Sequence, residues 1–169
     1  MPFDSNRHHR RSIRLRGYDY ASCGAYFVTL VTHKRELLFD DPVLHRVAET
    51  FWERIPRHAP HVSLDEWIVM PNHVHGILVI ETSVNSDPSS SGPAAGSLGA
   101  VVGNFKSVTA RRINRIRKTP GAPVWQRNYY DRIVRNEREL QAIRQTIADN
   151  PRNWEMDREH PNAIPRATS

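Results

Sequence analysis

The stretch that decides the fold is WIVMPNHVHGILVI, residues 67–80. An apolar run ends at Met70, Pro71-Asn72 favours a tight turn, and a second apolar run rich in β-branched side chains follows. Two such runs joined by a two-residue turn predict a β-hairpin, with strands over 61–70 and 73–80. This antiparallel pair is the centre from which the rest of the fold can be worked out.

Further elements are predicted on both sides of the hairpin. Before it, residues 25–32 (AYFVTLVT) are typical of a buried strand, and Asp41-Pro42 begins a helix that Pro56 ends. After it, a basic amphipathic helix is predicted over about 101–117, and a short strand over 131–135. Asn136 caps a last helix that Pro151 closes.

The order of these elements is strand, helix, strand, strand, helix, strand and a final helix. This order predicts an α+β domain with a ferredoxin-like split βαβ arrangement. We expect an antiparallel sheet of about four strands, helices packed on one face, and an extra C-terminal helix. The single domain is expected to span 11–154, between a loose basic N-terminus (1–10) and a polar tail (155–169). A Ser/Gly-rich stretch at 81–100 is expected to be a flexible insertion.

The composition excludes several classes of protein. Of 169 residues, 38% are hydrophobic, enough for one core. No apolar run approaches the ~20 residues of a membrane-spanning helix, and the start lacks a secretory signal. A single cysteine, Cys23, rules out an internal disulfide and a cysteine-based zinc site. The expected location is the cytoplasm.

The charge is strongly basic and unevenly placed. Arginine supplies 21 of the 24 basic residues, which are concentrated in residues 1–17 and 104–152. Because the guanidinium fork suits phosphate, this pattern predicts a nucleic-acid-binding face, although it also fits a merely solvated helix face. The candidate phosphate contacts are Arg11, Arg14, Arg16, Lys106, Arg111, Arg115 and Arg117.

His73 and His75 are the residues most suggestive of chemistry. Side chains two apart on a strand point to the same face, so the two rings can share one divalent ion. The alternative is a pair of unrelated histidines on a half-exposed strand.

Six motifs follow one another along the chain: RRSIRLRGYDY, GAYFVTLVTHKRELLF, WIVMPNHVHGILVI, VVGNFKSVTARRIN, VWQRNYYDRIVRNERELQAIRQ and ADNPRNW. In this order they resemble the HUH single-tyrosine transposases, in particular the subgroup associated with repetitive extragenic palindromes (REP). The resemblance runs from about residue 11 to 154 and is interrupted only by the Ser/Gly-rich insertion.

The resemblance implies a protein that cleaves and rejoins single-stranded DNA beside a palindromic hairpin. In the family, two histidines and a polar residue of the last helix bind Mg²⁺ or Mn²⁺, and a tyrosine one helical turn earlier attacks the phosphate. Carried over, the metal ligands are His73, His75 and Asn150, and the nucleophile position is Thr146. The partner is a single strand with a hairpin or palindromic repeat, and the protein is a monomer or homodimer.

Thr146 departs from the family pattern, which has tyrosine there. A phenol, with a pKa of about 10, leaves more readily than an aliphatic alcohol, and threonine is shorter by a ring. We therefore expect covalent cleavage by the family route to be weak or absent. Tyr129 or Tyr130 could substitute, or Thr146 could act slowly. Two other functions stay open: a catalytically silent hairpin-DNA-binding regulator, and a ferredoxin-like RNA binder.

Overall fold

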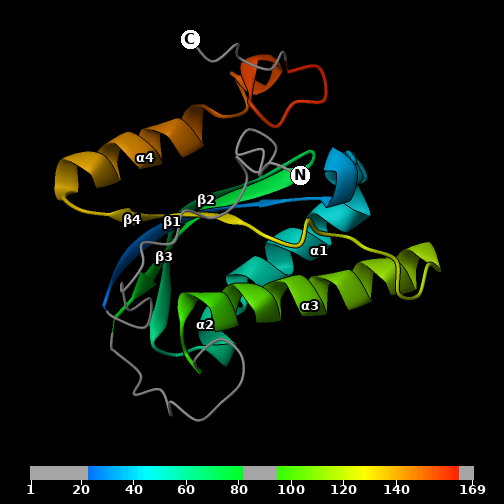
Figure 1. Ribbon diagram of the computed structural model, residues 1–169, viewed down its shortest axis with the longest axis horizontal. Coiled ribbons are helices and arrows are strands. Elements are labelled where there is room, and N and C mark those ends of the chain that lie inside the picture. Colours follow the sequence, from blue (N-terminus) through cyan, green and yellow to red (C-terminus); the bar gives the residue numbers. More distant parts are fainter. Residues whose placement is uncertain (1–22, 82–94, 164–169) are drawn as a thin grey trace, which may run out of the picture.

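Four strands form one antiparallel sheet in the computed structural model, which describes residues 23–81 and 95–163 (Figure 1). The strands are β1 (Gly24–Val31), β2 (Val62–Met70), β3 (His73–Ile80) and β4 (Tyr130–Val134), in the order β2-β3-β1-β4. Each neighbouring pair is antiparallel. The predicted hairpin is β2–β3, and the strand order is that of the split βαβ arrangement. The expected fold class is confirmed.

Helices cover both faces of this sheet (Figure 1). Helices α1 (Pro42–Glu53), α2 (Ile55–His58) and α3 (Leu98–Arg117) lie on one side. The extra C-terminal helix, α4 (Glu137–Asp149), lies on the other side, next to β2. Short 3₁₀ turns complete the described chain at His33–Arg35, Leu38–Asp40 and Trp154–Met156.

Side-chain caps define where the long helices begin. The Asp41 carboxylate accepts a hydrogen bond from the Val43 amide at 2.8 Å, and the Asn136 side chain accepts one from the Glu139 amide at 2.9 Å. Ser97 caps α3, which therefore begins at Leu98 and not near residue 101 as predicted. The last residues of the Ser/Gly-rich stretch thus belong to a helix. Residues 82–94 and the N-terminal segment 1–10 lie outside the described residues.

The main core lies between the sheet and the α1–α3 layer. Its largest fully buried side chains include Trp52, Tyr26 and Phe105. Gly76 of β3 is required for this packing, because a Cβ there would lie 2.2 Å from Cζ2 of Trp52. The core therefore holds β3 tightly on the side opposite its histidines.

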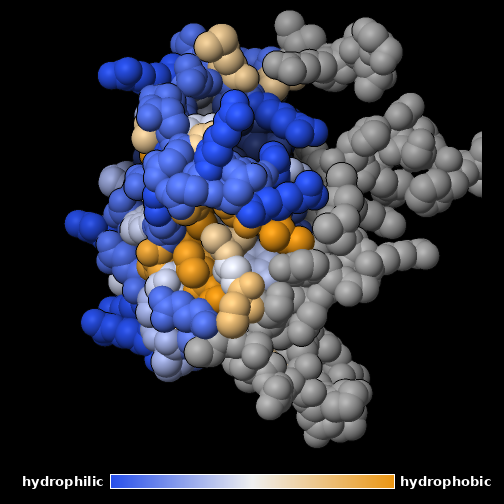
Figure 2. All heavy atoms as spheres, turned by 90° about the vertical axis from the view of Figure 1, so that its left-hand side faces the viewer, coloured by the Kyte–Doolittle hydropathy of each residue, from blue (hydrophilic) through white to orange (hydrophobic). Residues whose placement is uncertain are grey.

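A smaller hydrophobic cluster docks α4 on the other face of the sheet. Ile143 and Ile147 pack on Ile77 of β3. In Figure 2, the upper part of the molecule, where α4 lies, is hydrophilic on its surface, and hydrophobic side chains gather directly below it. Arg144 adds a bidentate contact to Asp65 of β2, with N···O distances of 2.7 and 2.6 Å. The hydrogen bond from Arg144 lowers the pKa of Asp65 below its usual value. These contacts fix where the C-terminal end of α4 lies.

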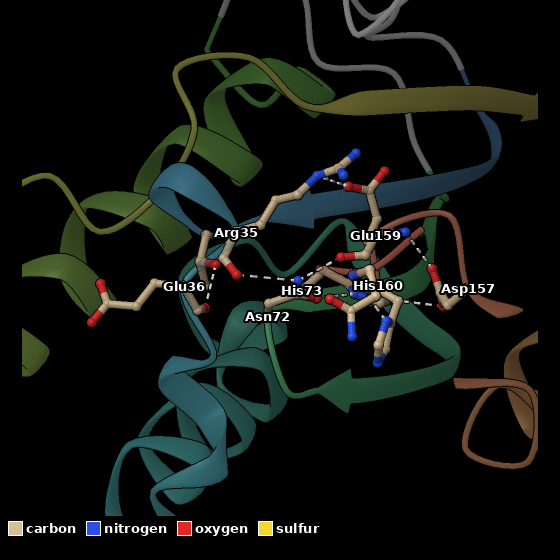
Figure 3. Close-up of polar contacts among 9 residues, drawn as sticks. Arg35, Glu36, Asn72, His73, Asp157, Glu159 and His160 are labelled. Carbon is tan, nitrogen blue, oxygen red and sulfur yellow. Dashed lines mark hydrogen bonds and ion pairs between the residues drawn. The ribbon is translucent and has the colours of Figure 1, made fainter. Parts of the chain in front are cut away.

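The chain after α4 folds back over the β2–β3 turn. The Asn72 side-chain amide donates to the Glu159 carbonyl at 2.6 Å, and the Arg35 guanidinium lies 3.1 Å from the Glu159 carboxylate (Figure 3). Contacts with the sheet region therefore continue past residue 154, as far as Glu159. None of the described helices is both long and apolar enough to cross a bilayer.

Candidate metal centre

His73 and His75 lie side by side on the face of the sheet that carries α4. Their ring centroids are 4.4 Å apart and the rings are inclined by 70°. His73 is fully buried, and His75 also stacks on Phe27, with centroids 5.4 Å apart. The alternation of strand side chains therefore brings the two rings together as the sequence predicts.

The Nδ1 atom of each ring forms a hydrogen bond with a neighbouring side chain. The Asn72 amide nitrogen donates to the Glu159 carbonyl, so its Oδ1 is the atom that lies 2.9 Å from His73 Nδ1. Because an amide oxygen only accepts, the proton is on Nδ1 and the Nε2 lone pair of His73 is free. His75 Nδ1 lies 2.8 Å from the Thr29 hydroxyl. Such partners on the second ring nitrogen are typical of metal-binding histidines.

Asp157 is the third group at this centre. It lies in the segment after α4, and its Oδ2 is 3.7 Å from His73 Nε2. One ligand atom from each of His73, His75 and Asp157 lies within 4.8 Å of the others. His73 Nε2 is buried and has no hydrogen-bond partner among the described residues. A divalent cation would satisfy that nitrogen, so the donor set fits a metal.

Both histidines are neutral at physiological pH. Burial, assisted by the neighbouring His75, lowers the pKa of His73 to about 2. Burial also lowers the pKa of His75 to about 4, although the Asp157 carboxylate opposes this shift. Neutral imidazole is the form that binds metal, so each ring offers a lone pair without first losing a proton.

Asn150, the predicted third ligand, lies next to Asp157. It is buried at the C-terminal end of α4, and its Nδ2 donates to Asp157 Oδ2 at 3.0 Å. The Glu159 amide donates to the other oxygen, Oδ1, at 2.7 Å. Two donors therefore orient the Asp157 carboxylate toward the histidines. The sequence reasoning missed Asp157 because it lies three residues beyond the last quoted motif, in the expected polar tail.

Thr146 lies one turn before Asn150 on α4. Its side chain is exposed, and its hydroxyl donates to the Ala142 carbonyl of the same helix at 2.9 Å. A pocket of about 350 Å³ opens beside the centre, and Thr146 is not among the residues that line it. Those residues are Phe27, Thr29, Val31, His75, Gln126, Asn128, Tyr129, Tyr130, Asn150, Asp157, Arg158 and Glu159.

Comparison of the sequence with protein-family models shows to which family the chain belongs. The family model described as IS200-like transposase matches residues 20–150, which is most of the chain and includes the histidine pair, α4 and Asn150. The chain belongs to the IS200-like transposase family. The resemblance to the HUH single-tyrosine transposases is thereby confirmed.

Two relatives show how far the similarity to known proteins extends. The chain is 36% identical over 176 residues to an uncharacterized protein of Haemophilus influenzae, covering 92% of this chain and 95% of that protein. Its fold matches a REP-associated tyrosine transposase solved with a REP hairpin, with a TM-score of 0.57. That match has 18% sequence identity and covers 83% of this chain and 73% of the other. It establishes a shared fold.

The residues expected to contact DNA differ in their surroundings. Lys106 is half-buried, and its ammonium donates to the Gln126 and Arg127 carbonyls at 2.6 and 3.1 Å. Burial lowers its pKa to about 8. These contacts turn its charge toward the protein's own backbone, and the assignment of Lys106 to the DNA-binding set stays a prediction.

The remaining members of that set differ in their surroundings. Arg111 and Arg115 are exposed on α3, whereas Arg117 is bound to Glu36 at 2.7 Å. Arg11, Arg14 and Arg16 lie outside the described residues. On α3, Arg111 and Arg115 therefore remain the better candidates for phosphate contacts.

Proposed function

We propose that this transposase binds single-stranded DNA beside a palindromic hairpin and acts on it with Mg²⁺ or Mn²⁺, cleaving and rejoining the strand. The observation that carries the proposal is the convergence of His73, His75 and Asp157 at a pocket of a transposase-family scaffold. Two neutral imidazoles and a carboxylate match the ligands of divalent cations that act on phosphates. The REP hairpin bound by the structural neighbour supports the substrate class.

The protein's own residues prepare this centre. Asn72 and Thr29 fix the two rings, and Asn150 and the Glu159 amide fix the carboxylate. A bound cation would supply the charge that polarises the scissile phosphate. The pocket beside His75 leaves room for a phosphodiester, and Arg158 at its rim adds a positive charge.

Thr146 is not expected to form the covalent linkage. Its hydroxyl is bound within α4, and an alkoxide is a poorer leaving group than a phenolate of pKa about 10. The change Thr146→Tyr should therefore create an SDS-resistant DNA adduct on α4, which mass spectrometry would locate. An equally abundant adduct on Thr146 in the unaltered protein would contradict this expectation.

Hairpin binding with and without a chelator tests the proposal as a whole. A fluorescent single strand with a hairpin should be bound, and strand cleavage should require Mn²⁺ and stop on addition of EDTA. An RNA hairpin of the same sequence should bind more weakly. Preference for RNA, or equal cleavage in EDTA, would refute the proposal.

A second candidate function follows from Thr146 itself. A transposase-derived protein that lacks the family nucleophile could occupy hairpins without cutting them. Such a regulator would bind the hairpin strand tightly and leave it intact at every Mn²⁺ concentration. Cleavage of the bound strand would exclude this function.

A further inference from the structure

Tyr130 lies on the sheet close to the metal centre. It is the first residue of β4 and pairs with Thr29 of β1, which in turn pairs with His75 of β3. Directly paired residues of adjacent strands point to the same face. His75, Thr29 and Tyr130 therefore form one row across the sheet, on the face that carries the metal centre.

The spacing of this row suits a group that reaches a phosphate at the centre. Adjacent strands lie about 4.8 Å apart, so the backbones of His75 and Tyr130 are separated by about 10 Å. Both side chains project from the same face of the sheet and line one pocket, in which a phosphate can lie between them. Tyr130 is 38% exposed, and it lines the same pocket as His75 and Asp157. Its ring meets that of Phe27 edge-on, with centroids 6.4 Å apart.

The adjacent tyrosine is placed differently. Tyr129 precedes β4 by one residue, so the alternation of the strand turns its side chain toward the opposite layer. There it packs against the main core, although part of it also lines the pocket. Of the two neighbouring tyrosines, only Tyr130 shares the row with His75.

We propose that Tyr130 supplies the attacking hydroxyl in this chain, in place of the α4 residue. The inference rests on the proposed function. The phenolic oxygen forms a bond to the scissile phosphorus, and the bond from phosphorus to the 3′ oxygen breaks. The proton of the phenol passes to solvent, and the departing 3′ oxygen takes one up as a free 3′-hydroxyl. Rejoining reverses these steps, with the phenolate as the leaving group.

Trapping the covalent adduct tests this assignment. The probe is a pool of single strands that carry one hairpin, randomised flanks and a 3′ fluorophore, which stays on the protein after attack. The full chain is incubated with the pool and Mn²⁺, and adducts are separated in SDS. We expect the unaltered protein and Thr146→Ala to carry the label on the peptide that contains Tyr130.

Two matched variants make the result decisive. Tyr130→Phe should reduce the adduct by about 100-fold or more, as expected on removal of a nucleophile. Tyr129→Phe should keep the adduct on this peptide; an adduct lost in Tyr129→Phe and kept in Tyr130→Phe would place the attacking oxygen on Tyr129, which also lines the pocket. Hairpin affinity and circular dichroism check that Tyr130→Phe is folded. An undiminished adduct in Tyr130→Phe would overturn the assignment.

Thr146→Tyr separates this assignment from the proposed function. If Thr146→Tyr forms an adduct and the unaltered protein forms none, Tyr130 is not the attacking group, while the proposed function stands. If no variant forms an adduct, the assignment to Tyr130 also fails. Mn²⁺-dependent hairpin binding then decides independently whether the protein recognises such strands.

Discussion

Gly76 shows how one residue couples the core to the metal centre. It follows His75 on β3 and faces the opposite layer, where Trp52 leaves no room for a Cβ. We predict that Gly76→Ala lowers the free energy of unfolding by about 1–3 kcal/mol through overpacking, measured by urea denaturation. Gly103→Ala is the control, because Gly103 is an exposed helical glycine with open space around its Cα. It should stabilise the protein by about 0.5–1 kcal/mol. Equal effects of the two variants would contradict this account.

At the same scale, individual side chains show what the sequence could and could not predict. The same-side placement of His73 and His75 follows from strand alternation alone, so it was predictable. Asp157 reaches His73 across 84 positions of the chain and follows Pro151, so no local periodicity connects the two. Lys106 lay on the predicted polar side of α3, but the sequence does not say that carbonyls of residues 126 and 127 would receive its ammonium.

At the scale of elements, helix α3 carries one basic side chain bound to the protein's own backbone and two exposed arginines that are candidate phosphate contacts. Changing both Arg111 and Arg115 to Gln should weaken hairpin binding by about tenfold, because each lost phosphate contact costs binding energy. Lys106→Gln should instead lower the free energy of unfolding by about 1–3 kcal/mol by removing hydrogen bonds of a charged donor. Fluorescence anisotropy and urea denaturation measure the two effects. Hairpin affinity lost in Lys106→Gln with unchanged stability would contradict this division.

The docking of α4 predicts a dependence of stability on pH. The pKa of Asp65 is lower in the folded protein than in the unfolded chain, where it is about 4. Its pairing with Arg144 therefore stabilises the fold above that pH, and the stabilisation is lost as the pH falls through the folded value. Asp65→Asn should be less stable than the unaltered protein by a constant amount between pH 5 and 8, measured by urea unfolding. The difference should shrink below about pH 4; a difference that stays constant at pH 3 would contradict the pairing.

Element patterns explain why the fold was predictable and the position of α4 was not. The β2–β3 hairpin and the helix caps Asp41 and Asn136 depend only on residues close together in the sequence, and each appears where expected. The face on which α4 packs depends on Ile143 and Ile147 meeting Ile77, a contact between distant segments. The apolar stripe of α4 predicted that it would be buried, but not against which face of the sheet.

For the whole molecule, the net charge of +6 predicts electrostatic binding of the nucleic-acid backbone. The dissociation constant for a hairpin single strand should rise by about tenfold or more between 50 and 200 mM NaCl. Anisotropy titrations at several salt concentrations measure this slope. An affinity that does not change over this range would remove the phosphate-binding interpretation of the arginines.

The central claim is that His73, His75 and Asp157 hold one divalent cation on the transposase scaffold. Anomalous diffraction from crystals soaked in Mn²⁺ tests it most directly. We predict a single strong peak about 2.0–2.3 Å from Nε2 of both histidines and from the Asp157 carboxylate, and its loss in Asp157→Ala crystals. A strong peak elsewhere in the protein with none between these three side chains, or a peak there that Asp157→Ala leaves unchanged, would contradict the claim.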